Sequence, residues 1–278
     1  GLAKAASLAR HRGVALNTVT ADVAAWDWPK GQYDLIAWIY LHLPPEDRAR
    51  HLPAHHARFR GNGRPPDGAP NPARNIMSTS LAWDERYQNG GFEFGEAPNL
   101  YLQSQAHRLR PGMRALAVGD GEGRNGVWLA GQGLAVTSLD WSGVGLAKAA
   151  SLARQRGVAL NTITADVAAW DWPRARFDLI AWIYLHLPPA DRAKATAGAM
   201  AALAPGGLLV LECFTPAQEG RRSGGPKLRD LLWSRAIVEE CFAGLEVLEL
   251  LEGTVFLDEG PRHQGHAEVV RALLRRSV

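Results

Sequence analysis

Cysteine is scarce in this chain: Cys213 and Cys241 are the only two among 278 residues. Two isolated cysteines provide neither a disulfide framework nor a zinc-ligand spacing, so we expect no metal and a reducing, cytoplasmic compartment. Long apolar runs are also lacking, because no stretch approaches the roughly 18 residues of a membrane-spanning helix. The first residues do not resemble a secretory signal. The sequence therefore predicts a globular protein without a membrane partner.

An excess of charge of one sign is missing as well. Lys and Arg number 31 against 28 Asp and Glu, which gives a formal net charge of +3 at pH 7. The basic residues are mostly single arginines, apart from short pairs such as Arg221-Arg222. A surface that follows a nucleic-acid backbone needs a denser basic patch, so we expect no nucleic-acid partner.

What the sequence does contain is a long repeat. GLAKAASLAR at residue 1 recurs at residue 145, and 42 of 50 positions are identical between residues 1–50 and residues 145–194. Structural repeats normally keep only their core pattern, so this similarity indicates a copied gene segment. The first copy contains Asp22, which matches Asp166, but neither a glycine turn nor an equivalent of Asp140. We expect it to bind no cofactor by itself.

The repeat suggests a division of the chain into three parts. Residues 1–53 are interpreted as a partial duplicate of residues 145–197, and the Pro- and Gly-rich residues 54–76 as a disordered linker. Residues 77–278, which begin at Met77, are expected to form a complete domain. A genuine fusion and a frame slip both remain open as the origin of the first part.

Helical and strand periods alternate from residue 100 onward. The expected helices cover residues 100–109, 125–132, 145–156, 189–203 and 228–242. The expected strands cover residues 113–118, 135–139, 160–164, 177–183, 208–214, 245–257 and 267–273, and Pro205-Gly206-Gly207 is an expected turn. This alternation predicts an α/β fold with a doubly wound, mostly parallel seven-stranded sheet, closed by an antiparallel C-terminal hairpin.

One stretch, RALAVGDGEGRNGVWLAGQGLAVTSLDW, has the pattern strand, glycine turn, helix, strand, acid. Gly119, Gly121 and Gly123 let the backbone approach a ligand and turn into a helix whose first amides face it. Asp140 follows about twenty residues later at a strand end, where a carboxylate can accept both ribose hydroxyls. Asp166, after the third strand, stands where an adenine amino group would lie, and a helix cap is its alternative role. The spacing predicts a nucleoside-containing cofactor.

The ordered series VGDGEGRN, LDW, TADV, FDLIAWIYLHLPP and APGGLLVLE resembles the motifs of class I S-adenosylmethionine (SAM)-dependent methyltransferases. The segment WDERYQNGGFEFGEAPNLYL and the hairpin RHQGHAEVV are similar to the TehB-like and thiopurine-methyltransferase-like branch. The resemblance covers nearly all of residues 77–278. It implies a Rossmann-like enzyme that methylates a small molecule, such as a thiol or a chalcogen oxyanion, as a monomer or weak homo-oligomer.

The resemblance also implies which residues bind SAM. They are Gly119, Asp120, Gly121, Glu122, Gly123, Asn125, Asp140, Trp141, Asp166, Val167 and Trp182. One position departs from the family pattern, because Ala117 stands where the family usually has an acid, two residues before the first glycine. Asp120 and Glu122 are the candidates to supply the missing negative charge near the cofactor's amino group.

Two segments are expected to face the acceptor. One is the leading segment, WDERYQNGGFEFGEAPNLYL, which the resemblance implies to be a lid, and the other is the final hairpin. Their candidate residues are Trp83, Tyr87, Phe94, Asn99, Arg262, His263 and His266. Ordinary packing is the alternative for the aromatic residues. His186 is the candidate catalytic base, and a structural histidine in the LHLPP turn is its alternative. A His-x-x-His pair without a third ligand does not indicate a metal site.

Methyl transfer from a sulfonium is an in-line displacement in which the cofactor supplies the electrophile and the leaving group. The protein mainly aligns the reactants, which contributes on the order of 7–11 kcal/mol. A base is needed only for an acceptor that arrives protonated, so the lack of an obvious catalytic dyad does not argue against an enzyme. Two alternatives stay open: a nicotinamide-dependent Rossmann oxidoreductase, and a non-catalytic cofactor-binding protein crippled by the fused fragment.

Overall fold

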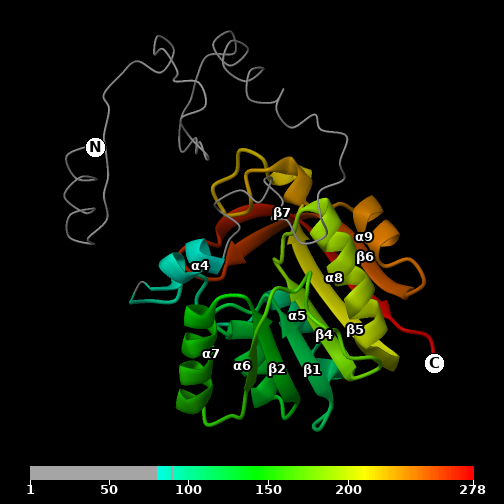
Figure 1. Cartoon of the computed structure of the whole chain (residues 1–278). Helices are drawn as coiled ribbons and strands as arrows, with labels where there is room; N and C mark the ends of the chain where they lie inside the picture. Colours follow the sequence, from blue (N-terminus) through cyan, green and yellow to red (C-terminus); the bar gives the residue numbers. More distant parts are fainter. Residues whose placement is uncertain (1–79, 89) are drawn as a thin grey trace, which may run out of the picture. The chain divides into compact units, whose positions relative to one another are not determined.

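Seven strands form a single sheet in the order β3-β2-β1-β4-β5-β7-β6 (Figure 1). The structure is a computed structural model that describes residues 80–88 and 90–278. The chain separates into two units, Gly1–Ala69 and Pro70–Val278, and every described residue belongs to the second. The expected duplicate (1–53) and linker (54–76) lie outside the described residues.

The first five strands run parallel, and β7 pairs antiparallel with both β5 and β6. Their bounds are β1 (Arg114–Val118), β2 (Ala135–Asp140), β3 (Asn161–Thr164), β4 (Phe177–Ile183), β5 (Leu203–Phe214), β6 (Glu246–Asp258) and β7 (Gln264–Arg275). The expected mostly parallel α/β sheet with an antiparallel hairpin is therefore confirmed.

Helices cover both faces of this sheet. They are α4 (Ser80–Tyr87), α5 (Leu100–Ser104), α6 (Arg124–Gly131), α7 (Gly143–Gln155), α8 (Pro189–Ala202) and α9 (Arg235–Cys241), with single 3₁₀ turns at Ala106–Arg108, Pro216–Gln218 and Arg229–Leu231. Helices α8 and α9 contribute to the core on one face, and α5 and α6 to the core on the other. This is the doubly wound arrangement, in which helices shield a parallel sheet from water on both sides.

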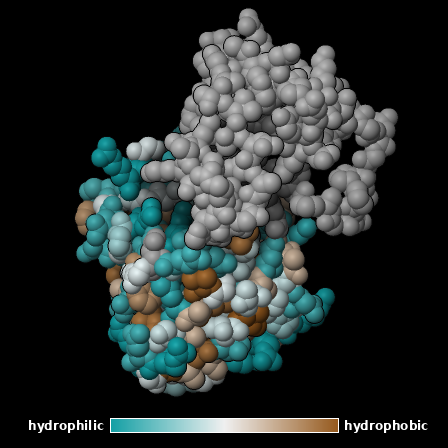
Figure 2. Space-filling view, turned by 60° about the vertical axis from the view of Figure 1, so that its left-hand side comes forward, coloured by the Kyte–Doolittle hydropathy of each residue, from teal (hydrophilic) through white to brown (hydrophobic). Residues whose placement is uncertain are grey.

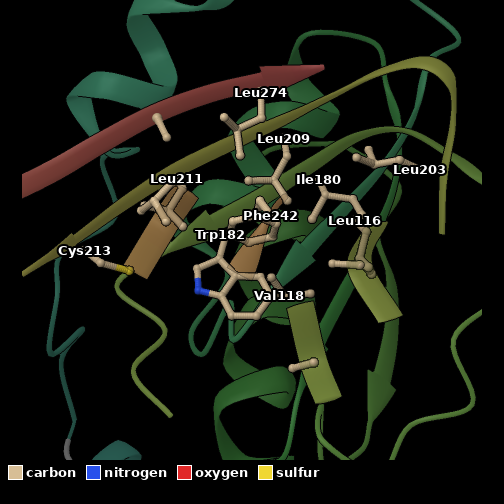
Figure 3. Packing of buried hydrophobic residues seen from close by; sticks show 14 of the residues in the cluster. Leu116, Val118, Ile180, Trp182, Leu203, Leu209, Leu211, Cys213, Phe242 and Leu274 are labelled. Carbon is tan, nitrogen blue, oxygen red and sulfur yellow. The ribbon is translucent and has the colours of Figure 1, made fainter. Parts of the chain in front are cut away.

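The core explains why β4 is apolar along its whole length. Successive side chains of a strand point to opposite faces, so Ile180 and Trp182 join the core under α8 and α9, while Leu179 and Ala181 join the core under α5 and α6. Figure 3 shows Trp182 inside the first core, near Phe242. Its indole ring meets the Phe242 ring edge-on at 6.0 Å between centroids.

Two expected helices are shorter than their sequence pattern. Helix α5 ends at Ser104, whose hydroxyl donates to the carbonyl of Tyr101 and so competes with the helical hydrogen bonds. In the second case the helix begins only at Arg235, because the Ser234 hydroxyl accepts from the amide of Ile237 as an N-cap. Trp233, just before that cap, is fully buried on the core and anchors the extended chain there.

The expected turn at Pro205-Gly206-Gly207 is also different. These residues lie inside β5, which begins at Leu203. Gly206 has φ of 75°, and the pairing of β4 with β5 shifts register between Phe177 and Leu179. The glycine pair therefore forms a bulge in the strand, where a positive φ lets the extra residue be accommodated.

Among residues 80–88 and 90–278, no helix is long and apolar enough to cross a bilayer, and no three His, Cys, Asp or Glu side chains are grouped to hold a metal ion. On the face drawn in Figure 2, apolar residues form small groups among hydrophilic ones.

Candidate functional site

The glycine turn joins β1 to α6 at the carboxyl edge of the sheet. Gly119, Gly121 and Gly123 have φ of 62°, 54° and 88°, which side chains rarely adopt. The turn is also crowded, because a Cβ on Gly123 would lie 2.5 Å from the Cβ of Ala149. Gly123 is the N-cap of α6 and has no side chain to cap it. Asp120 accepts from the amide of Gly126, so the amides of Arg124 and Asn125 are the ones available to an anionic group of a ligand.

Asp140 ends β2 beside this turn. Its Oδ2 accepts from the amide of Gly121 at 2.9 Å, and its Oδ1 accepts from the amide of Ser142 at 2.8 Å. Burial raises the pKa of Asp140 to about 6, although these amides favour the ionised form. Each carboxylate oxygen keeps a second lone pair, so Asp140 can accept hydrogen bonds from a bound ligand as well.

The Asp120 side chain is buried between β2 and the start of α6. Its carboxylate accepts from the Ser138 hydroxyl and from the amide of Gly126. Ser138 is the direct partner of Ala117 in the pairing of β1 with β2. The buried carboxylate of Asp120 therefore occupies the neighbourhood of Ala117, where the sequence lacks an acid. Burial raises the pKa of Asp120 to about 6, although the Ser138 hydroxyl and the Gly126 amide lower it.

Glu122 is turned toward the leading segment. Its Oε1 accepts from the ammonium group of Lys148 at 2.6 Å, and its Oε2 accepts from the amide of Glu93 at 2.8 Å. Asn125 makes a similar contact, since its Oδ1 accepts from the amide of Asn99 at 2.9 Å. These two side chains anchor the leading segment over the start of α6.

Helix α4 covers the glycine turn. A Cβ on Gly121 would lie 2.5 Å from the Tyr87 hydroxyl, and a Cβ on Gly145 would lie 2.9 Å from the Tyr87 ring. Trp83 packs against Tyr87 with 5.4 Å between ring centroids. Asp84 accepts from the Ser142 hydroxyl and from the amide of Val144 at the start of α7. The helix is thus held on both strand ends that form the predicted cofactor site.

The remaining predicted cofactor residues differ in their placement. Asp166 accepts from the amide of Ala168 in a local turn, while Val167 is buried and Trp141 is partly exposed. Trp182, in contrast, is fully buried, and its indole N–H donates to the carbonyl of Leu185. It belongs to the core, because its position on β4 directs the ring to the face covered by α8 and α9.

A buried polar cluster lies next to the glycine turn, and only Asn99 and His263 among its members were predicted from the sequence. Its charged residues are Arg124, Glu212, Glu259 and Arg271. The Asn99 side-chain amide donates to Glu212 at 2.8 Å and to Glu259 at 3.0 Å. The Glu212 carboxylate also accepts from the Tyr184 hydroxyl and from Arg271. Among its other members, the one signal in the sequence is Glu212, an acid within the apolar strand sequence LLVLECF.

His263 lies among the rings of Phe94, Tyr184 and Phe214, with centroid distances of 4.8, 4.5 and 5.5 Å. It is 4% exposed, and its Nδ1 has no hydrogen-bond partner among the described residues. The nearest carboxylate, that of Glu259, is 3.8 Å away, too far for a hydrogen bond. Burial lowers the pKa of His263, which favours the neutral ring.

Two other predicted hairpin residues lie outside this cluster. Arg262 is exposed and pairs with Glu93 of the leading segment at 2.6 Å. His266 is exposed, and its ring meets the Phe256 ring at 5.3 Å between centroids. The Arg262 contact therefore joins the hairpin to the leading segment, and the His266 contact stays within the hairpin.

His186 has the geometry of a structural residue. Its Nδ1 lies 2.9 Å from the carbonyl of Leu231, and its Nε2 accepts from the amide of Phe214 at 3.4 Å. Burial lowers its pKa to about 4. Because both ring nitrogens bond to the backbone, the geometry favours the alternative of a histidine that holds the chain after β4 over the role of a base.

Tyr184, directly after β4, has a backbone φ of 53°. Such a conformation is uncommon for a non-glycine residue and is found at functional sites where the surroundings enforce it. Here the enforcing contacts are the Glu212 carbonyl, which accepts from the Tyr184 amide at 2.7 Å, and the Glu212 carboxylate, which accepts from the Tyr184 hydroxyl. No pattern in the sequence indicated this residue.

A hollow of about 520 Å³ opens at the opposite edge of the sheet. It is lined by residues such as Arg110, Asp178, Pro205 and Arg275, near the amino ends of β1 and β4. Ligands of open parallel sheets bind at the carboxyl ends of the strands, so this hollow is not the candidate site.

The site as a whole fits SAM. The start of α6 can meet the cofactor's carboxylate and Asp140 can meet its ribose. The three glycines keep the turn free of side chains where Leu185, Tyr87 and Ala149 border it. The donor and acceptor set matches the chemistry of an adenosyl amino acid.

Comparison with known proteins agrees with this geometry. Residues 115–207 match the family profile described as a methyltransferase domain, which includes the glycine turn, Asp140 and Asp166. A search of curated proteins finds no match.

Three solved structures share the fold. A protein from the conversion of a disulfide bond into a thioacetal group during echinomycin biosynthesis has a TM-score of 0.60 and 19% identity, over 72% of this chain and 93% of that one. TehB from Haemophilus influenzae has a TM-score of 0.55 and 16% identity, over 70% and 66%. The N-methyltransferase NodS from Bradyrhizobium japonicum, in complex with S-adenosylhomocysteine (SAH), has a TM-score of 0.55 and 18% identity, over 71% and 97%.

The domain match and the fold together confirm the enzyme class and the cofactor expected from the sequence. Residues 115–207 match a methyltransferase domain, and the unit that contains them has a Rossmann-like fold.

Proposed function

We propose that this chain methylates a small-molecule acceptor of the thiol or chalcogen-oxyanion class, as an enzyme of the TehB-like branch. The observation that carries the proposal is the meeting of the glycine turn, the start of α6 and Asp140 at one edge of the sheet. The proposal also takes residues 77–278 as the complete catalytic unit, active as a monomer or weak homo-oligomer.

The cofactor side is assigned to residues of β1, β2 and the lid. Asp140 accepts the ribose hydroxyls, and the first amides of α6 bind the cofactor's carboxylate. Asp166 and Val167 border the adenine, while Trp83 and Tyr87 cover the site from α4. Asp120 provides buried negative charge below the turn, next to Ala117. When bound, SAM supplies the sulfonium methyl group and the leaving group.

The acceptor side is assigned to the aromatic wall around His263. Sulfur makes favourable contacts with aromatic rings because it is polarizable, so the rings of Phe94, Tyr184 and Phe214 suit a soft acceptor. His186 is engaged by the backbone on both ring nitrogens. An acceptor that is already ionised needs no base, which is consistent with the proposed class.

Calorimetry with the full chain tests the cofactor assignment. We expect SAM and SAH to bind and NADH not to bind; the reverse pattern would identify an oxidoreductase. A panel of acceptors, consisting of small thiols, tellurite, selenite, amines and hydroxyl compounds, is then screened for SAH release. Methylation of amines or hydroxyls alone would contradict the acceptor class, and SAM binding without transfer to any acceptor would favour the non-catalytic alternative.

A further inference from the structure

A carboxylate of the final hairpin reaches the helix that starts at the glycine turn. Glu259 lies between β6 and β7 and is 2% exposed. Its Oε2 accepts from Nη1 of Arg124 at 2.8 Å. Arg124 is the first residue of α6, directly after Gly123. A buried ion pair therefore joins the acceptor side of the site to the cofactor side.

The other oxygen of Glu259 holds the leading segment against the same helix. Oε1 accepts from the amide of Leu100 at 3.1 Å and from the side-chain amide of Asn99 at 3.0 Å. Asn99 in turn donates its backbone N–H to Asn125, the second residue of α6. The start of α6 is thus connected to Glu259 twice, directly through Arg124 and indirectly through Asn99.

The charge of Glu259 is maintained in this environment. Burial alone would raise its pKa, but the ion pair with Arg124 and the amide of Leu100 lower the pKa to about 2. Arg124 extends the contact toward the acceptor side, because its guanidinium lies 6.0 Å from the ring centroid of Tyr184. Removal of either charge from a buried pair leaves the other uncompensated, so the two groups constrain each other strongly.

We propose that Glu259 is a positioning residue: it fixes Arg124, and through it the first amides of α6, in the orientation that binds the cofactor. The inference rests on the proposed function, because it assigns those amides to the carboxylate of SAM. The inference goes beyond the proposed function, because it makes cofactor affinity depend on a residue of the acceptor-side hairpin.

Glu212 offers a matched control. It is as buried as Glu259, pairs with an arginine, Arg271, and accepts from the same side-chain amide of Asn99. Glu212 shares the indirect link to α6 through Asn99, but among the described residues only Glu259 pairs directly with Arg124. A general loss of stability would affect both glutamate variants, whereas the proposed positioning affects only the Glu259 variant.

The experiment measures the SAH dissociation constant by calorimetry in the full chain. Glu259→Gln is expected to weaken SAH binding by about tenfold, because small misplacements of binding groups have effects of this size or larger. Glu212→Gln is expected to change it by less than about threefold. Thermal unfolding shows whether each variant is folded at the temperature of the titration.

A double-mutant cycle identifies the route of the effect. If Glu259 acts through Arg124, then Glu259→Gln adds no further loss of SAH affinity to Arg124→Gln. Additive losses, or equal losses in the two glutamate variants, would overturn the proposal. If Glu259→Gln does not fold, Glu259→Asp takes its place, since it keeps the charge on a side chain too short to hold Arg124. Wild-type protein that binds NADH and not SAH would instead refute the proposed function.

Discussion

At the scale of single residues, Asp140 combines burial with a proposed role that needs its charge. Its pKa is raised to about 6 by burial, above the roughly 3.9 of an unfolded chain. Ionisation therefore costs folding free energy as the pH rises through this interval, and protonation removes that cost as the pH falls. The ionised Asp140 thus lowers the free energy of unfolding at neutral pH, where its carboxylate can accept ribose hydroxyls.

The raised pKa predicts a pH dependence of cofactor binding. SAH affinity is expected to be constant above about pH 7 and to fall by up to about tenfold per unit below pH 6, because protonation removes the acceptor charge. Calorimetry across pH 5 to 8 measures this. In the Asp140→Asn variant, we expect weaker SAH binding at pH 7.5. We also expect SAH affinity to lose its dependence on pH below 6, except for the part that titration of Asp120 contributes. An unchanged slope in this variant would assign the titration to another group.

A second residue-scale prediction concerns Gly126, which makes room for the carboxylate of Asp120. A Cβ at this position would lie 2.3 Å from Oδ2 of Asp120 and from Oγ of Ser138. Gly126→Ala is therefore expected to reduce the free energy of unfolding by about 1–3 kcal/mol through overpacking. Chemical denaturation measures the change.

Gly131, the last residue of the same helix, provides the control for that substitution. A Cβ added to Gly131 would have nothing within 4 Å, so Gly131→Ala is expected to be neutral or to stabilise by up to about 1 kcal/mol. Equal effects of the two substitutions would show that crowding at Asp120 is not the cause.

At the scale of elements, α4 places its Tyr87 ring over the glycine turn, and the proposed function makes this helix a lid. The ring must move for a ligand to enter or leave, since it borders both Gly121 and Gly145. Tyr87→Ala is expected to raise both the association and dissociation rate constants of SAH by about tenfold, as removal of a gate does. Stopped-flow fluorescence measures both rates. Leu81→Ala, on the same helix but 72% exposed, should leave them unchanged. Faster dissociation alone would show that Tyr87 holds the ligand without gating its entry.

At the scale of the whole molecule, the first copy of the repeat has neither a glycine turn nor an equivalent of Asp140. The glycine turn, Asp140, the lid helix and the buried polar cluster all fall between residues 80 and 278. A chain that starts at Met77 is therefore expected to fold and to bind SAH within about threefold of the full chain. Calorimetry on both chains measures this. Loss of binding in the shorter chain would show that residues 1–76 contribute to the fold or to the site.

Local patterns were sufficient for the parts of the site that depend on short segments. A glycine turn after one strand and an acid at the end of the next are brought together by any parallel pairing of those strands, and β1 and β2 pair in this way. The sheet was predictable for the same reason, since alternation of strands and helices leaves few topologies. Trp182 could not be placed correctly, because which face of β4 bears the core helices is decided by the chain as a whole.

The amino-acid sequence by itself determined the order of the elements and the cofactor-binding turn, because both follow from periodicity and from backbone conformations that only glycine adopts readily. Only the tertiary structure decided the buried polar cluster. Asn99, Arg124, Glu212 and Glu259 come from four separate segments, and no spacing in the sequence relates them. Their pairing depends on the burial of charges, which the chain tolerates only where folding brings opposite charges and hydrogen-bond partners together.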